Sequence, residues 1–366
     1  MLSFIPNEYY SSVFYHIILV VVLFVFFGTY KTELTNSSSL KAKNGFGIVL
    51  MLFIILYMGF RPISIYFGDM VIYNRELQMY IDGAPFNSES DILFEAMKYF
   101  YAKYLNAQLF FFTCSFFYLY LLYLGTKKIF KDYWFYAFLM FIIAFTFWAY
   151  GVNGIRNGLA TSLFVYGISK EKKVNTILIL LCSYFIHSSM MIPIIAYLMT
   201  FLYSNTKVYI ISWILLIPLS LAIGGFFESF FLGLGFGADK LDSYLGDFNQ
   251  ANEGVEISVG FRWDFLLYSA SGIFAGWYYI FKKKFEDILY QKIFHIYLIS
   301  NGLWILIIRA NYSNRFAYLS WFILGLVLIY PLLKSELVKN QHVLIGKILI
   351  VYVGFTYLMN VILYKS

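Results

Sequence analysis

Residues 10–30, YSSVFYHIILVVVLFVFFGTY, decide the fold class of this chain. The run contains no Asp, Glu, Lys or Arg, and it reaches the roughly 20 residues that an α-helix needs to cross a bilayer. No basic segment precedes the run, and no small-residue cleavage site follows it. We therefore expect a retained membrane helix rather than a cleaved signal peptide.

Similar apolar runs recur along the whole chain of 366 residues. Hydrophobic residues make up 61% of the chain and charged residues only 13%, a composition that excludes an ordinary soluble domain. The predicted fold is an all-α integral membrane protein, a single polytopic domain over residues 1–366 with about 12 transmembrane helices. The fifth, sixth and seventh spans are short for a full crossing, so we expect them to be tilted, broken or re-entrant. The candidate spans are 10–30, 45–60, 105–124, 133–150, 157–169, 174–187, 190–203, 208–227, 265–281, 293–308, 316–333 and 343–363.

Lysines and arginines fall in alternate loops between these spans. Because cytoplasmic loops carry an excess of basic residues, we assign the lysine loops to the cytoplasm and the arginine loops and both termini to the outside. The loop lysines also explain the net charge of +7, so no nucleic-acid partner is expected. The cytoplasmic lysines are Lys31, Lys41, Lys43, Lys127, Lys128, Lys131, Lys170, Lys172, Lys173, Lys207, Lys282, Lys283, Lys284 and Lys334. The outer arginines are Arg61, Arg75, Arg156, Arg262, Arg309 and Arg315.

Two outer segments are long, near residues 61–104 and 228–264. In the first, the spacing of apolar residues predicts an amphipathic helix over about 89–104 that lies on the outer surface. The apolar residues of this helix are Ile92, Leu93, Ala96, Phe100 and Tyr104. The second segment is rich in Gly and then acidic, and the cytoplasmic loops are too short for a folded domain. We therefore expect the chemistry outside the membrane or within the bundle.

Arginines recur beside predicted helix N-termini on the outer side. Arg156, in the stretch YGVNGIRNGLA over residues 150–160, and Arg315, in NYSNRFAY over 311–318, each begin an inward-running helix. Arg262 also precedes such a helix, and Arg309 lies one turn from Arg315. A guanidinium binds phosphate through two parallel hydrogen bonds, and a helix N-terminus favours anions, so this set would suit a diphosphate. The alternative is that each arginine reaches lipid headgroups or caps a neighbouring helix.

Two residues could act as a general base on the outer side. His187, in FIHSSM over 185–190, ends a short span, and an imidazole can take a hydroxyl proton near neutral pH. Asp69 opens the first long outer segment and could instead pair with Arg61 or Arg75. A hydrogen-bonded structural role for His187 also stays open. No cofactor or metal is expected, although the acidic outer loops could supply oxygen ligands to a divalent cation.

Five short blocks resemble one known family in their order along the chain. They are Arg61…Gly68-Asp69…Tyr73, Gly154-Ile-Arg156-Asn-Gly-Leu-Ala160, Phe185-Ile-His187-Ser-Ser, Asp239-Lys-Leu-Asp-Ser-Tyr244 and Asn314-Arg315-Phe-Ala-Tyr318. The chain is similar to the EpsG-like group of Wzy-type polysaccharide polymerases. The resemblance implies a bacterial inner-membrane glycosyltransferase with a fold related to the GT-C class.

The resemblance also implies a reaction and its partners. Undecaprenyl-diphosphate-linked oligosaccharides would be donor and acceptor at the outer face, as in O-antigen or capsule synthesis, and membrane lipids and a chain-length regulator protein would be further partners. The resemblance marks Arg156, His187 and Arg315 as functional, followed by Arg61 and Asp69. From the chemistry of the residues, we expect Arg156, Arg315, Arg309, Arg61 and Arg262 to bind the diphosphate, while His187 and Asp69 compete for the role of base. An O-antigen ligase, a lipid-linked glycan flippase or exporter, and another GT-C transferase stay open as alternatives.

Overall fold

The structure is a computed structural model that describes residues 5–87, 89, 91–233, 260–310 and 313–363. All regular elements in these ranges are helical. The chain divides into two compact units, of which unit 1 comprises Met1–Met190 and Ile329–Ser366 and unit 2 comprises Met191–Leu328. The predicted block 239–244, the rest of the acidic stretch up to Glu256, and Asn311 lie outside the described residues.

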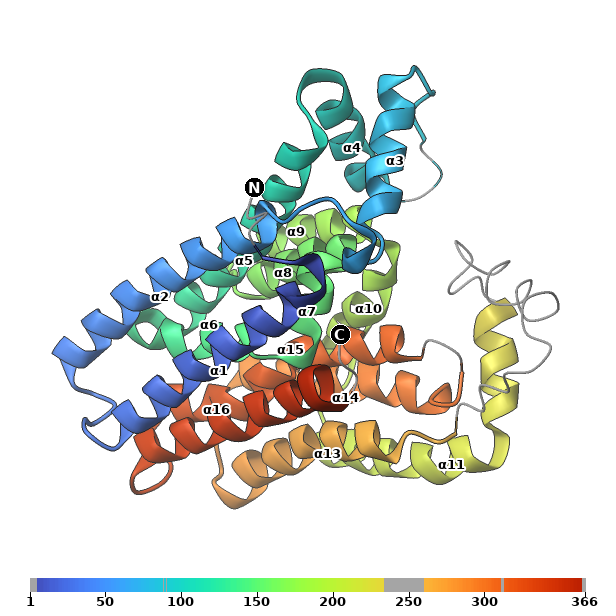
Figure 1. Ribbon diagram of the computed structural model, residues 1–366. Coiled ribbons are helices and arrows are strands. Elements are labelled where there is room, and N and C mark those ends of the chain that lie inside the picture. The colour runs from blue at the N-terminus through green and yellow to red at the C-terminus, as the bar shows by residue number, and fades with distance from the viewer. Residues whose placement is uncertain (1–4, 88, 90, 234–259, 311–312, 364–366) are drawn as a thin grey trace. The chain divides into compact units, whose positions relative to one another are not determined.

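Unit 1 is built around three short buried helices. Every residue of α6 (Trp134–Ile142) is buried, and α7 (Phe145–Val152) and α8 (Ile155–Ile168) follow it in the chain. Helix α5 packs against α2, α6 and α8, while α1 packs along α16 (Figure 1). The other helices are α1 (Tyr10–Thr29), α2 (Ser37–Gly59), α3 (Met70–Ile81), α4 (Ile92–Tyr104), α5 (Ala107–Phe130), α9 (Lys173–Ile186) and α16 (Gln341–Tyr357).

The described residues of unit 2 form four α-helices and the greater part of a fifth. Helix α14 packs against α10, α11 and α13. A buried polar cluster joins α14 to α11, α13 and α15, because Asn301 of α14 donates to Ser269 and Ser320 and accepts from Trp213 Nε1. The helices are α10 (Met191–Leu202), α11 (Thr206–Gly233), α13 (Trp263–Trp277), α14 (Ile288–Leu306) and α15 (Asn314–Lys334), of which α15 ends in unit 1.

Each of the twelve predicted spans contains helix in the described residues. The predicted number of about 12 transmembrane helices is not confirmed. Among the described residues, six helices are long and apolar enough to cross a membrane by length and composition, which indicates a membrane protein. The expected shortness of the fifth to seventh spans is confirmed, since α8, α9 and α10 have 14, 14 and 12 residues. The six are Asn7–Thr29, Ser37–Gly59, Ala107–Ile142, Thr206–Phe227, Asn314–Lys334 and Gln341–Leu363.

The prediction of one continuous span over residues 133–150 is wrong. The helix breaks between α6 and α7, where Ala144 takes extended dihedral angles with ψ of 143°. The hydroxyl of Thr356, from α16, donates to the freed carbonyl oxygen of Ile143 at 2.8 Å. Broken helices are tolerated in a membrane protein when neighbouring helices satisfy the freed backbone groups in this way.

The lysine loops of unit 1 gather at one end of its helices. Lys128, at the end of α5, pairs with Glu171 at 2.6 Å, and Asn44 of α2 donates to the carbonyl oxygen of Asp132. Lys43 of α2 lies 3.3 Å from His342 Nε2 at the start of α16. The opposite ends of α2, α5 and α9 carry the residues around Arg61, α4 and His187, and α3 and α4 extend beyond this end in Figure 1. Within unit 1, the structure thus groups the lysine loops as the alternating pattern predicts.

Arg61 ties two helix ends together inside unit 1. Its side chain is fully buried, and its two terminal nitrogens donate to the carbonyl oxygens of Met58 in α2 and Val152 in α7. A cation at helix C-termini is favourable because the helix dipoles place negative charge there. Burial lowers the pKa of Arg61 to about 10, which leaves the side chain charged at neutral pH. Arg61 therefore holds the start of the Asn153–Arg156 connection in place.

The alternation of lysine and arginine loops predicts on which side of the membrane a given residue lies. In a variant whose Cys114 and Cys182 are replaced by Ala, Asp82→Cys should react with an impermeant thiol reagent on intact spheroplasts. Lys172→Cys should react only after the membrane is opened, because its loop is assigned to the cytoplasm. The cysteine-free parent is the control, and labelling of Lys172→Cys on intact cells would reverse the orientation.

The buried position of Arg61 predicts a loss of stability when it is replaced. Arg61→Met leaves two carbonyl groups unpaired, and each costs about 1–3 kcal/mol. We expect a lower melting temperature of the purified protein in detergent. Arg75→Met, at an exposed arginine of α3, is the matched control and should melt like the wild type. An unchanged melting temperature of Arg61→Met would contradict this structural role of Arg61.

Candidate functional site

The candidate site centres on Asp91, the residue before α4. Asp91 has a φ of 49°, in the left-handed region that residues other than glycine seldom adopt. An aspartate at this position usually accepts hydrogen bonds from the first turn of its own helix, but Asp91 makes no such bond. Its side chain is fully buried and turned towards α8 and α9 instead. A strained backbone that redirects a carboxylate is a feature of functional sites.

Three groups converge on this carboxylate. Arg156 Nη1 lies 2.7 Å from Asp91 Oδ2, and His187 Nδ1 lies 2.9 Å from the same oxygen. The backbone N–H of Ser188 donates to Oδ1 at 2.8 Å. The side chains of Arg156 and His187 keep 22% and 14% of their surface exposed, whereas that of Asp91 keeps none. The two predicted functional residues are thus joined by a carboxylate that the sequence analysis had not singled out.

The local fold brings these groups together. Arg156 is the second residue of α8, and His187 follows the last residue of α9. The hydroxyl of Ser183 in α9 donates to the carbonyl oxygen of Ala160 in α8 at 2.7 Å, which fixes the two helices to each other. Gly158 lets the start of α8 approach α7, because a Cβ at this position would lie 2.3 Å from the carbonyl oxygen of Tyr150.

Asp91 is held ionised by its partners. Burial alone would raise its pKa, but the hydrogen bond and charge of His187, the charge of Arg156 and the Ser188 N–H together hold the pKa below its usual range. An ionised Asp91 can only accept hydrogen bonds, so Nδ1 of His187 carries a proton when it faces Asp91. In the neutral imidazole, Nε2 is then the basic nitrogen that can face a substrate. This is the arrangement of a carboxylate-oriented general base.

Tyr73 and Asp69 lie beside this group. Tyr73 is buried and hydrogen-bonded with Arg156, and burial raises its pKa to about 12 despite the guanidinium, so the phenol stays protonated. Asp69 precedes α3, and its backbone N–H donates to Asn153 Oδ1 at 2.8 Å. Gly68 has a φ of 61° and passes so close to Asn153 that no Cβ would fit. The loop with Asp69 is therefore fixed to the connection that leads into Arg156.

Three of the predicted arginines belong to unit 2 and gather at one end of it. Arg262 precedes α13 and binds Asp264 through two hydrogen bonds, of 2.9 and 2.6 Å. Arg309 lies after α14 with its guanidinium 5.8 Å from the ring of Phe261, and Arg315 is the second residue of α15. Arg309 and Arg315 are exposed, so an anion can reach them. Asp264 occupies the fork of Arg262, and a phosphate there would have to displace it.

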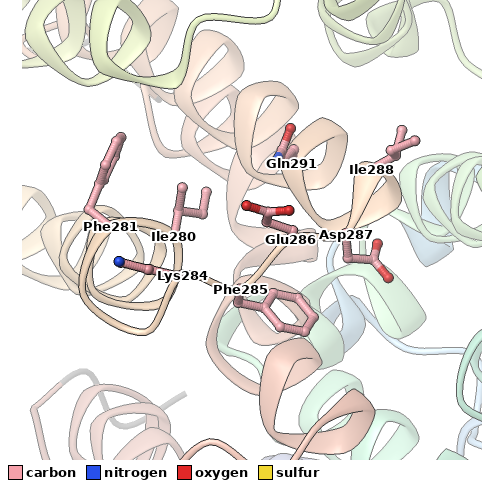
Figure 2. A pocket seen from close by; sticks show the side chains of 8 residues that line it. All are labelled: Ile280, Phe281, Lys284, Phe285, Glu286, Asp287, Ile288 and Gln291. Carbon is pink, nitrogen blue, oxygen red and sulfur yellow. The ribbon is translucent and has the colours of Figure 1, made fainter.

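A cavity of about 420 Å³ lies elsewhere in unit 2. Figure 2 shows its lining, in which Lys284, Glu286 and Asp287 stand beside Phe281 and Phe285. These residues connect the end of α13 to the start of α14, whereas Arg262 and Arg309 lie at the other ends of the same helices. Within the described part of the chain, no three side chains of His, Cys, Asp or Glu are placed to hold a metal ion.

Comparison with known proteins gives one match. No curated protein and no solved structure matches the chain significantly. The family description "EpsG family" matches residues 44–366, which include every residue of the site described above. This family suggests a role like that of a glycosyltransferase that polymerises polysaccharides. The chain belongs to the EpsG family.

Proposed function

We propose that the protein joins undecaprenyl-diphosphate-linked oligosaccharide repeat units at the outer face of the bacterial plasma membrane. Membership of the EpsG family supports a polysaccharide polymerase, and the apolar helices support a membrane location. The observation that carries the proposal is the buried Asp91 carboxylate, which holds a cation and an imidazole side by side. Glycosyl transfer from a lipid diphosphate needs both kinds of group.

The imidazole of His187 would activate the acceptor. The acceptor hydroxyl of the new repeat gives its proton to Nε2 of His187 while its oxygen bonds to the anomeric carbon of the donor sugar. Asp91 orients the ring through Nδ1 and stabilises the imidazolium that forms. Asp69 is the rival base, and its loop is tied to Asn153 near the same helix start.

Arg156 would stabilise the leaving group. As the sugar–oxygen bond breaks, the electron pair and the negative charge stay on the undecaprenyl diphosphate. A fixed guanidinium and the N–H groups of the first turn of α8 can stabilise this charge without reorganising. Attack from the opposite face would invert the anomeric centre. In this proposal Arg61 holds the connection before Arg156. The assignment of Arg309, Arg315 and Arg262 as diphosphate ligands stays a prediction.

The glycan on the cell surface distinguishes this function from its rivals. A strain without this protein should carry single repeat units in place of a ladder of chain lengths, because export and attachment still work. An O-antigen ligase or an exporter predicts no surface glycan at all. Absence of surface glycan in the deletion strain would therefore contradict the polymerase.

Complementation of that strain tests the proposed roles of the site residues. Asp91→Asn keeps the shape but removes the charge, so we expect a loss of about 10²–10⁴ in polymerisation rate, the range for an impaired general base. His187→Gln should lose as much. Asp82→Asn, at an exposed carboxylate of the same outer segment, is the matched control. Normal ladders from His187→Gln, with none from Asp69→Asn, would make Asp69 the base.

If the planar guanidinium of Arg156 is needed, replacement by lysine should reduce the rate of polymerisation. Arg156→Lys keeps the charge but cannot bind both Asp91 and a phosphate in the same geometry. The loss of one leaving-group contact should cost on the order of 3 kcal/mol, or about a hundredfold in rate. The ladder is measured at matched expression, with Arg75→Lys as the control. A normal chain-length distribution would remove Arg156 from the site.

A further inference from the structure

Helix α4 buries the charged side chains of Glu95 and Lys98, while a stripe of apolar and aromatic side chains on its other face is exposed. Glu95 and Lys98 keep 7% and 3% of their surface exposed, whereas Phe100 and Tyr104 keep 51% and 62%. Leu93 lies on the same outer face at 37%. A helix that packs against a protein and faces water usually exposes a polar stripe, whereas this face of α4 exposes Leu93, Phe100 and Tyr104.

The inward charges of α4 are fully engaged. Lys98 Nζ lies 2.6 Å from Glu95 on the same helix and 2.5 Å from Glu76 of α3. The hydroxyl of Tyr80 in α3 donates to the second oxygen of Glu95 at 2.8 Å. These contacts fix the rotation of α4 about its axis against α3. The apolar face therefore cannot turn inward without breaking a buried network of charges.

The position of α4 in the chain places its apolar face beside a membrane span. Only Leu105 and Asn106 separate α4 from α5, which begins the candidate span Ala107–Ile142. The exposed apolar surface continues across this connection, through Leu105 at 47% and Leu109 at 36%. With Ala107–Ile142 as a membrane span, the end of α4 lies at the level where α5 leaves the bilayer.

The end of α4 carries residues typical of a membrane interface. The ammonium of Lys103 lies 5.5 Å from the ring of Tyr104 and 6.0 Å from that of Tyr99. Tyrosines collect at the headgroup level, and lysines there extend their charge towards water while their methylene groups stay in the apolar layer.

We propose that α4 docks on the phospholipid leaflet, with Leu93, Phe100 and Tyr104 in the boundary between headgroups and acyl chains. The occupant is the bilayer surface, and it covers a face that would otherwise be an exposed apolar stripe. Asp91 immediately precedes α4, so this contact also fixes the depth of Asp91, Arg156 and His187 relative to the lipid headgroups. The proposal does not depend on which reaction the site performs.

Spin labels on the full chain in lipid nanodiscs test this docking directly. The label is attached to Phe100→Cys in the variant without native cysteines, and its collisions with oxygen and with a water-soluble nickel chelate are compared. Phe24→Cys on the exposed face of α1 is the lipid reference, and Asp82→Cys is the water reference. We expect the oxygen-to-nickel ratio at Phe100 to be several-fold above that at Asp82 and below that at Phe24.

Two results would overturn the proposal. A ratio at Phe100 equal to that at Asp82 would place α4 in water. Poor access of both reagents, with spin–spin broadening that disappears when unlabelled protein is added, would show that a second copy of the chain covers the face. Leu93→Cys repeats the measurement on the same face, so that disruption by one substitution cannot decide the result. Normal activity of the labelled protein is not needed for either reading.

Discussion

A buried carboxylate needs positive partners, and in this protein that requirement fixes the geometry of the candidate site. Asp91 takes one hydrogen bond each from Arg156, His187 and the backbone of Ser188. These partners come from the start of α8, the end of α9 and the turn after it. Removing the carboxylate would leave a guanidinium and an imidazole without the group that orients them, so the relative position of the two depends on Asp91.

The candidate site depends on a break in the helices that a regular helix bundle would not have. The break at Ala144 and the short helices α7 and α8 put a helix N-terminus inside unit 1, where the carbonyl and N–H groups of broken helices are satisfied by neighbours. Arg61 then fixes the end of α7, and Gly158 lets α8 pass close to it. The break in the helix therefore helps to position Arg156 at the start of α8.

Apolar runs and charge patterns made most of the helices predictable, because period and length are local properties of the sequence. Arg156 and His187 were predictable from their place beside helix ends. Asp91 could not be predicted as a site residue, because an aspartate before an amphipathic helix is usually interpreted as an N-cap. Its side chain instead turns towards contacts that form only in the folded chain. The break at Ala144 could not be predicted either, because no Gly or Pro lies near it in the sequence. The burial of Arg61 likewise depends on tertiary contacts, and the charge of an arginine would lead one to expect an exposed side chain.

The central claim is that Asp91 acts on the chemistry through His187, and a double-mutant cycle on purified protein measures this most directly. The rate of polymerisation of lipid-linked repeats is compared for Asp91→Asn, His187→Gln and the double variant. If Asp91 and His187 act as one unit, the second substitution removes nothing further. The double variant should then be about as slow as the slower single variant. Losses that multiply in the double variant would show that the two residues act independently and would contradict the account.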